Sequence, residues 1–237
     1  MQNLYGFETS ELYKQSIFCF IAHGKFRRIY RSHPHVFTGS NLAIHCFLLS
    51  LEEWIQKNKN IRPQEVFYST DGGPENFTKN FIALAHYIVH KRITKRLVLR
   101  RLPVGHTHSD PDGFFGNSHT KARDSMLITP QHYEAMLKEL LEMHHLDSVV
   151  KDIWAVPDYD SFMNDSRDRQ FGNYKFKSNA TLIIILEAVD PVVFPEFQFG
   201  VKMTYRLYAA DVVQEIVPTS ENEIGLRVQT LYVTTGN

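Results

Sequence analysis

The chain has 237 residues, of which 43% are hydrophobic and 13% aromatic, enough for a substantial core and unlike a disordered protein. Its 26 basic and 26 acidic residues give a formal net charge of zero, so any polyanion must be bound by a local basic patch. The longest apolar runs are too short to span a bilayer, and no membrane association is expected. Cys19 and Cys46 lie in apolar runs, which favours buried, reduced thiols and an intracellular compartment.

The first elements along the chain are expected to be two strands and a helix. Residues 16–23 form an apolar, aromatic run of strand type, and residues 25–31 continue as a more exposed strand after a turn at Gly24. Ser40 is a suitable N-cap for a helix over residues 40–57, where apolar residues recur with the helical period.

Strands and helices then alternate. Residues 65–70 predict a short strand that ends at Asp71, and a helix begins near residue 74. Residues 96–104 predict the next strand, which is followed by a helix from about residue 111. This alternation indicates an α/β protein with a partly parallel, mixed sheet flanked by helices.

The rest of the chain is expected to form three parts after a core over residues 1–125. Residues 126–157 are read as a helical extension, in which Thr129 and Pro130 begin a helix that ends near residue 143. Residues 158–173 are polar and rich in Gly, Asn and Asp, as in a linker. Residues 174–237 are expected to form a small C-terminal β-rich module, with strands at residues 181–187, 198–208 and 226–234.

Two segments carry the residues with chemical potential. They are Phe67-Tyr-Ser-Thr-Asp-Gly-Gly-Pro-Glu-Asn-Phe77 and Leu102-Pro-Val-Gly-His-Thr-His-Ser-Asp-Pro-Asp-Gly-Phe-Phe-Gly116. Each is a short apolar run that stops at a polar, glycine-containing turn and continues into an expected helix. In an α/β sheet, active sites gather at such carboxyl ends of strands. The candidate residues are Asp71, His106, His108, Asp110 and Asp112.

Each candidate also has a purely structural interpretation. Asp71 precedes a glycine, and Asp-Gly is a common hairpin signal. Asp112 is compatible with a helix cap. His106 and His108 share a face of an extended segment and are compatible with structural zinc, although no further His or Cys cluster completes a tetrahedral set. A role in which the two histidines orient metal-binding carboxylates by hydrogen bonds is the alternative.

A cationic run lies between the two segments. Residues 91–101 contain six basic side chains and no acidic one. Such a run is either a solvated loop and edge strand or a surface for the phosphates of a nucleic acid. The six side chains are Lys91, Arg92, Lys95, Arg96, Arg100 and Arg101.

The element order resembles the RNase H-like fold of DDE transposases and retroviral integrases. Ser69-Thr-Asp-Gly-Gly-Pro-Glu-Asn-Phe77 resembles the strand end that supplies the second metal-binding carboxylate of that fold. The segment that begins at Leu102 resembles a transposon-derived domain family of eukaryotes with a Pro-Gly/Val-Gly-His-Thr-His/Tyr-x-x-x-Asp motif. The resemblance implies that Asp71 and Asp112 hold Mg²⁺ or Mn²⁺, with Asp110 as a further candidate ligand. It places His106 and His108 next to the metal.

The function implied by this resemblance is transposase- or integrase-like, metal-dependent phosphoryl transfer on DNA by an intracellular, nuclear protein that is compatible with a homo-oligomer. The strand that would carry the first acid has no counterpart in residues 1–15, so weak or absent activity is expected. The alternative is a non-enzymatic DNA- or protein-binding remnant of a mobile element. If Asp71 and Asp112 share metal ions, their carboxylates should lie within about 9 Å of each other.

Overall fold

The computed structural model describes residues 15–36, 39–70, 78–101, 110–125, 127, 129–142, 146–163, 181–195, 200–209, 212–217 and 227–231. The chain divides into two compact units. Unit 1 takes its residues from 1–38, 45–51 and 108–157, and unit 2 takes its residues from 39–44, 52–107 and 158–237. Helix α1 (Ser40–Lys57) contributes its middle residues to unit 1 and its two ends to unit 2. No helix among the described residues is long and apolar enough to cross a bilayer.

Unit 1 contains a three-stranded sheet in the order β1-β2-β5. Strands β1 (Ile17–Ala22) and β2 (Phe26–Ser32) form the expected hairpin, in which Gly24 adopts a positive φ of 70°. Strand β5 (Asp147–Ile153) pairs with β2 in parallel. A β-branched pair, Val149-Val150, suits this strand, which lies in the stretch expected to be a helical extension.

The core of unit 1 lies between its sheet and two helices, α3 (Asp110–Asp124) and α4 (Pro130–Glu142). Ile29 of β2 is fully buried against apolar side chains of both helices: Phe114, Met136, Leu137, Leu140 and Leu141. On the other face of β2, the Tyr30 hydroxyl forms a hydrogen bond of 2.8 Å with the Ser50 hydroxyl of α1. The expected start of α4 at Pro130 is confirmed.

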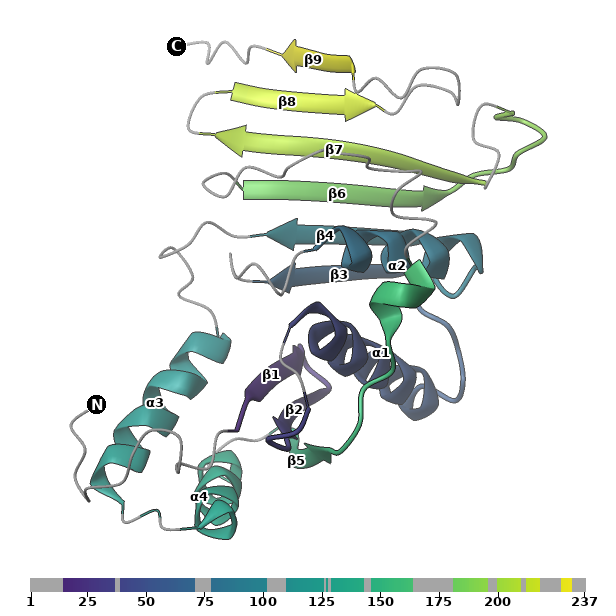
Figure 1. Ribbon diagram of the computed structural model, residues 1–237. Helices are drawn as coiled ribbons and strands as arrows, with labels where there is room; N and C mark the ends of the chain where they lie inside the picture. Colours follow the sequence, from purple (N-terminus) through teal and green to yellow (C-terminus); the bar gives the residue numbers. More distant parts are fainter. Residues whose placement is uncertain are drawn as a thin grey trace. The chain divides into compact units, whose positions relative to one another are not determined.

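Unit 2 contains a six-stranded sheet in the order β3-β4-β6-β7-β8-β9 (Figure 1). Strands β3 and β4 are parallel, and every other neighbouring pair is antiparallel. The strand bounds are β3 (Glu65–Thr70), β4 (Arg96–Arg101), β6 (Thr181–Ala188), β7 (Val201–Ala209), β8 (Val212–Val217) and β9 (Arg227–Leu231). Together with unit 1, this makes the protein α/β with two mixed sheets flanked by helices.

Helix α2 (Lys79–His90) covers one face of this sheet (Figure 1). The Thr78 hydroxyl caps the helix by accepting a hydrogen bond of 3.1 Å from the Phe81 amide. The Phe81 ring stacks on Tyr68 of β3 with 5.0 Å between ring centroids. On this face the sheet buries four aliphatic side chains completely: Leu97, Leu99, Ile184 and Leu186.

The boundaries of the second half of the chain differ from those expected. Strand β6 pairs with β4 along the whole length of β4, so the described strands after residue 174 complete the sheet begun by β3 and β4. The first residues of the expected linker, 159–163, are helical. Asp158 explains this, because its carboxylate accepts hydrogen bonds from the amide and hydroxyl of Ser161, in the manner of an N-cap.

Within the described residues, each sheet has two edge strands, β1 and β5 in unit 1 and β3 and β9 in unit 2. Strand β1 pairs only with β2, and β3 pairs only with β4.

Candidate functional site

The carboxyl ends of β3 and β4 lie side by side. The parallel register pairs Glu65 with Arg96 at one end and Thr70 with Arg101 at the other. Asp71 follows Thr70 in the sequence, and the segment that contains His106 and His108 follows Arg101. The two motif-bearing segments therefore leave the sheet from neighbouring strands at one edge, which we call the strand-end edge.

The last residues of both strands are buried. Thr70 is 9% exposed and Arg101 is 6% exposed. Burial lowers the pKa of the Arg101 guanidinium, because the low-polarity surroundings disfavour its charged form. A guanidinium with a pKa far above neutrality keeps its charge, so the strand-end edge has a buried positive charge.

The predicted metal ligands divide between described and undescribed parts of the chain. Asp71, His106 and His108 lie outside the described residues. Asp110 is the first residue of α3, and Asp112 has an exposed side chain in its first turn. Because α3 belongs to unit 1 and the strand-end edge to unit 2, the expected separation of Asp71 and Asp112 stays a prediction. Among the described residues, no three His, Cys, Asp or Glu side chains are arranged to hold a metal ion.

Lys91, Arg92 and Arg96 of the basic run have contacts within unit 2. Arg92 donates hydrogen bonds to the carbonyl oxygens of Val189 and Gly200, at 2.8 and 3.3 Å. Arg96 forms ion pairs with carboxylates on both neighbouring strands, Glu65 at 3.4 Å and Glu187 at 3.2 Å. The Lys91 ammonium lies 5.4 Å from the centroid of the Tyr87 ring. Through these contacts, the side chains of Arg92, Arg96 and Lys91 are bound to neighbouring groups of unit 2 around β4.

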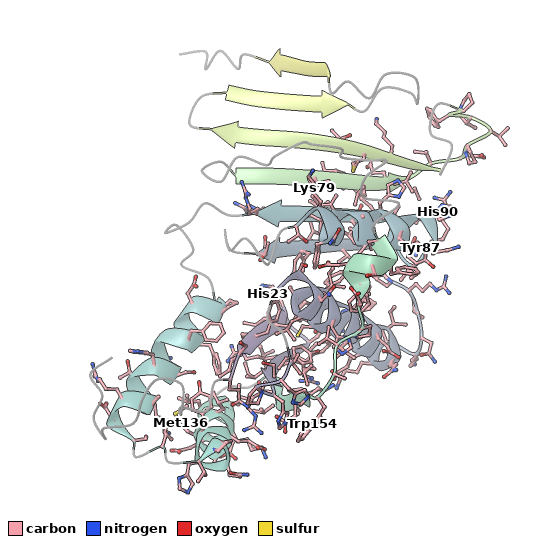
Figure 2. The ribbon with its side chains drawn as sticks, viewed as in Figure 1. His23, Lys79, Tyr87, His90, Met136 and Trp154 are labelled. Atoms are coloured by element: carbon pink, nitrogen blue, oxygen red, sulfur yellow. The ribbon has the colours of Figure 1, made fainter. Side chains whose placement is uncertain are left out.

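The basic run also follows the length of a strand instead of forming one patch. Lys91 and Lys95 precede β4, whereas Arg100 and Arg101 end it, and an extended strand of this length spans about 16 Å. Figure 2 labels Lys79 at the start of α2 and His90 at its end, and the basic run begins with the residue after His90. Of the six cations, Arg100 and Arg101 are therefore the two next to the strand-end edge.

A polar cluster that the sequence analysis missed lies at the start of α2. The Asp160 carboxylate accepts hydrogen bonds from the Ser40 hydroxyl at 3.0 Å and from the Asn80 amide group at 2.5 Å. The Asp160 backbone amide donates to the Asn41 side-chain oxygen at 3.0 Å. One carboxylate thus binds the first residue of α1 and the second residue of α2, where helix dipoles favour a negative charge.

This cluster matters for the candidate site because α2 begins directly after residues 71–77. Asn80 is 7% exposed, and its side-chain oxygen has no hydrogen-bond partner in the described part of the chain. The sequence signal for the cluster was Asp158 three residues before Ser161, a helix-capping pattern within the stretch read as a linker.

The fold and the strand-end edge define an α/β protein whose polar motifs leave a parallel strand pair at one edge. A family model described as a domain of unknown function, DUF7869, matches residues 7–188. The match covers more than half of the chain, and the protein therefore belongs to this family. No curated protein and no solved structure matches the chain significantly.

Proposed function

We propose that the protein descends from, or is, a metal-dependent enzyme of RNase H-like type that transfers phosphoryl groups on DNA. Asp71 and Asp112 would hold Mg²⁺ or Mn²⁺, with Asp110 as a further ligand, and His106 and His108 would orient the carboxylates or contact a phosphate. In the same proposal the protein acts in the nucleus.

The observation that carries this proposal is the pairing of Thr70 with Arg101. It supports the proposal because ligands of open α/β sheets bind outside the carboxyl ends of the strands. Asp71 and the histidine-containing segment are attached to this edge by the sequence. The order of β1, β2, α1, β3, α2, β4 and α3 along the chain is a second support, since it is the order that the RNase H-like resemblance implies.

The residues at the strand-end edge would have distinct roles. Divalent metal ions supply charge neutralisation on the attacking and leaving oxygens of an in-line displacement. Arg100, which is exposed at the end of β4, would contact the phosphate backbone, since one guanidinium group can donate hydrogen bonds to two phosphate oxygens. Asp160, with Ser40 and Asn80, would fix the start of α2, which follows the Asp71-containing segment in the sequence.

The test is a titration of the purified protein with Mg²⁺ and Mn²⁺ by isothermal titration calorimetry, combined with cleavage of supercoiled plasmid DNA. We expect metal binding that weakens at least about tenfold in Asp71→Asn, because each carboxylate contributes charge to the ion. Cleavage is expected to be weak and to disappear in the same variant.

Asp124→Asn is the matched control. It removes an exposed carboxylate at the end of α3, where Asp124 pairs only with its neighbour Arg123 among the interactions that the structure describes. Metal binding that is unchanged by Asp71→Asn would refute the proposal. Binding of DNA without any metal dependence would favour the non-enzymatic binding module instead.

A further inference from the structure

Phe67 of β3 is an aromatic side chain that the fold leaves in solvent. It is 70% exposed, although it lies inside a strand. Its neighbour Tyr68 is buried and stacks on Phe81 of α2. Because successive side chains of a strand point to opposite faces, Phe67 lies on the face of the sheet away from α2, which we call the outer face.

Phe67 is the exposed end of an apolar row across the outer face. In the register of the sheet, Phe67 pairs with Val98 of β4, and Val98 pairs with Ile185 of β6. Val98 and Ile185 are each 9% exposed, so these two side chains are buried whereas the phenyl ring is not. An exposed ring forgoes most of the stabilisation that burial would give. Packing therefore does not require an aromatic side chain at this position.

An available cation lies next to the ring. Arg100 of β4 pairs in register with Ser69, two residues after Phe67, so all three side chains lie on the outer face. Neighbouring strands are about 4.8 Å apart and two residues span about 6.6 Å, which puts the backbones of Phe67 and Arg100 about 8 Å apart. Arg100 is exposed and forms no ion pair or hydrogen bond with any of the described residues.

Arg96 is on the same face of β4 but differs from Arg100. It forms ion pairs with Glu65 at 3.4 Å and Glu187 at 3.2 Å, so its charge is compensated. Arg96 begins β4, whereas Arg100 is the last residue but one of this strand. The available positive charge of this strand face therefore lies next to the strand-end edge, where Asp71 follows β3 in the sequence.

An exposed ring beside an available guanidinium suits a single-stranded nucleic acid. A base without a pairing partner stacks on an aromatic side chain, and an arginine contacts the phosphate of the strand. Bases in a duplex are already stacked on one another, so their faces are not accessible to a ring. A protein partner fits less well, because a stable interface buries about 800 Å² on each side and the row offers one exposed apolar side chain among the described residues.

We propose that Phe67 and Arg100 bind single-stranded DNA on the outer face and lead it to the strand-end edge. A base stacks on the Phe67 ring, and the Arg100 guanidinium donates hydrogen bonds to an adjoining phosphate. Phe67 lies about 10 Å along β3 from Thr70, the last residue of the strand, so the stacked nucleotide is held close to that edge. The choice of DNA rests on the proposed function, whereas the two contacts need no metal ion.

The experiment uses the full chain and a short fluorescein-labelled oligothymidine in buffer with EDTA, and fluorescence anisotropy gives the Kd. We expect Phe67→Leu, which keeps an apolar side chain but removes the ring, to weaken binding at least about fivefold. Phe67→Trp should bind at least as tightly as the wild type, because it retains a stacking surface. Arg100→Met should weaken binding and lower the slope of log Kd against log salt by about 0.7, the value for one phosphate contact of a single strand.

Phe162→Leu is the matched control, because Phe162 is 64% exposed and lies outside the outer face, and it should bind as the wild type does. A duplex of the same length should bind more weakly, with equal affinity for the wild type and Phe67→Leu. Since the titration contains no free divalent metal, its outcome is independent of the metal-binding test of Asp71→Asn, and the failure of either proposal is seen separately. No binding of the single strand by the wild type, or equal affinity in Phe67→Leu, would overturn the proposal.

Discussion

Among single residues, Arg31 is a buried cation that the fold stabilises with two carboxylate partners. Its guanidinium binds Asp152 of the parallel partner strand at 2.7 Å and Glu134 of α4 at 2.5 Å. The hydrogen bond from Arg31 is the main cause that lowers the pKa of Asp152, and the hydrogen bond from Lys138 is the main cause for Glu134. Both carboxylates therefore stabilise the fold above their normal pKa, and this contribution is lost as the pH falls through their lowered values.

His86 of α2 is a partly buried histidine whose pKa is lowered. Burial, and next the charge of His90, lowers the pKa of His86 from 6.5 to about 4. Between these two values the unfolded chain binds a proton that the folded protein does not, so stability decreases as the pH falls from about 6.5 to about 4. We expect a loss of about 2–3 kcal/mol in the free energy of unfolding over this window.

The measurement is urea denaturation of wild type and His86→Gln at several pH values across the window. The variant should lose this part of the pH dependence, because glutamine does not titrate. His132→Gln, a change at an exposed position of α4, should keep the wild-type slope. Equal slopes for wild type and His86→Gln would show that His86 is not buried in its neutral form.

At the scale of elements, the connection between β6 and β7 depends on one glycine and one arginine. Gly200 has a φ of +61°, a conformation that side chains with a Cβ atom rarely adopt. Its carbonyl oxygen accepts hydrogen bonds from the Val189 amide at 2.9 Å and from the Arg92 guanidinium at 3.3 Å. The arginine that the sequence suggested as a phosphate contact thus bridges the start of β4 to this connection.

Gly200→Ala should destabilise the protein by about 1–2 kcal/mol. A Cβ atom there would lie 3.1 Å from the Val189 carbonyl oxygen, in addition to the unfavourable φ. Urea denaturation measures the effect, with Gly116→Ala of helix α3 as the control. A Cβ at Gly116 meets nothing within 4 Å, and alanine favours a helix by about 0.5–1 kcal/mol, so this control should stabilise. Equal stability of the two variants would contradict the strain assigned to Gly200.

At the scale of the whole molecule, the larger sheet is assembled from two distant parts of the chain. Strands β3 and β4 come from residues 65–101, and β6 to β9 come from residues 181–231. Their junction pairs Leu97 with Leu186 and Leu99 with Ile184, and all four side chains are fully buried. Each such side chain contributes about 1.5–3 kcal/mol, so neither part is expected to be stable alone.

A chain that ends at residue 178 should therefore aggregate. It would expose the edge of β4 together with Leu97 and Leu99, and an unpaired apolar edge is a template for association. Size-exclusion chromatography measures this, with a chain that lacks only residues 227–237, and hence β9, as the control that should remain monodisperse. A monodisperse 1–178 chain with the near-ultraviolet circular dichroism of a packed protein would show that the β4–β6 junction is dispensable.

Local sequence patterns were sufficient for most single elements. The hairpin around Gly24, helix α1 from Ser40, strand β3 to Thr70 and the start of α4 at Pro130 were all predicted within a residue or two. These elements depend on alternation, helical periodicity and capping, which involve residues close in the sequence. Strand β5 was missed because its pairing with β2 joins residues that are far apart in the chain.

The sequence by itself determined that the protein is α/β and that its acidic and histidine-containing motifs follow the ends of two strands. Only the tertiary structure decided that these strands are parallel neighbours, since register is set by contacts across the sheet. It also decided which basic side chains have partners. Arg92 donates to a carbonyl oxygen in the connection between β6 and β7, and Arg96 pairs with a carboxylate of a neighbouring strand, whereas two guanidinium nitrogens of Arg27 have no acceptor among the described residues. A basic residue in a sequence shows a charge, but its partner is chosen by the fold.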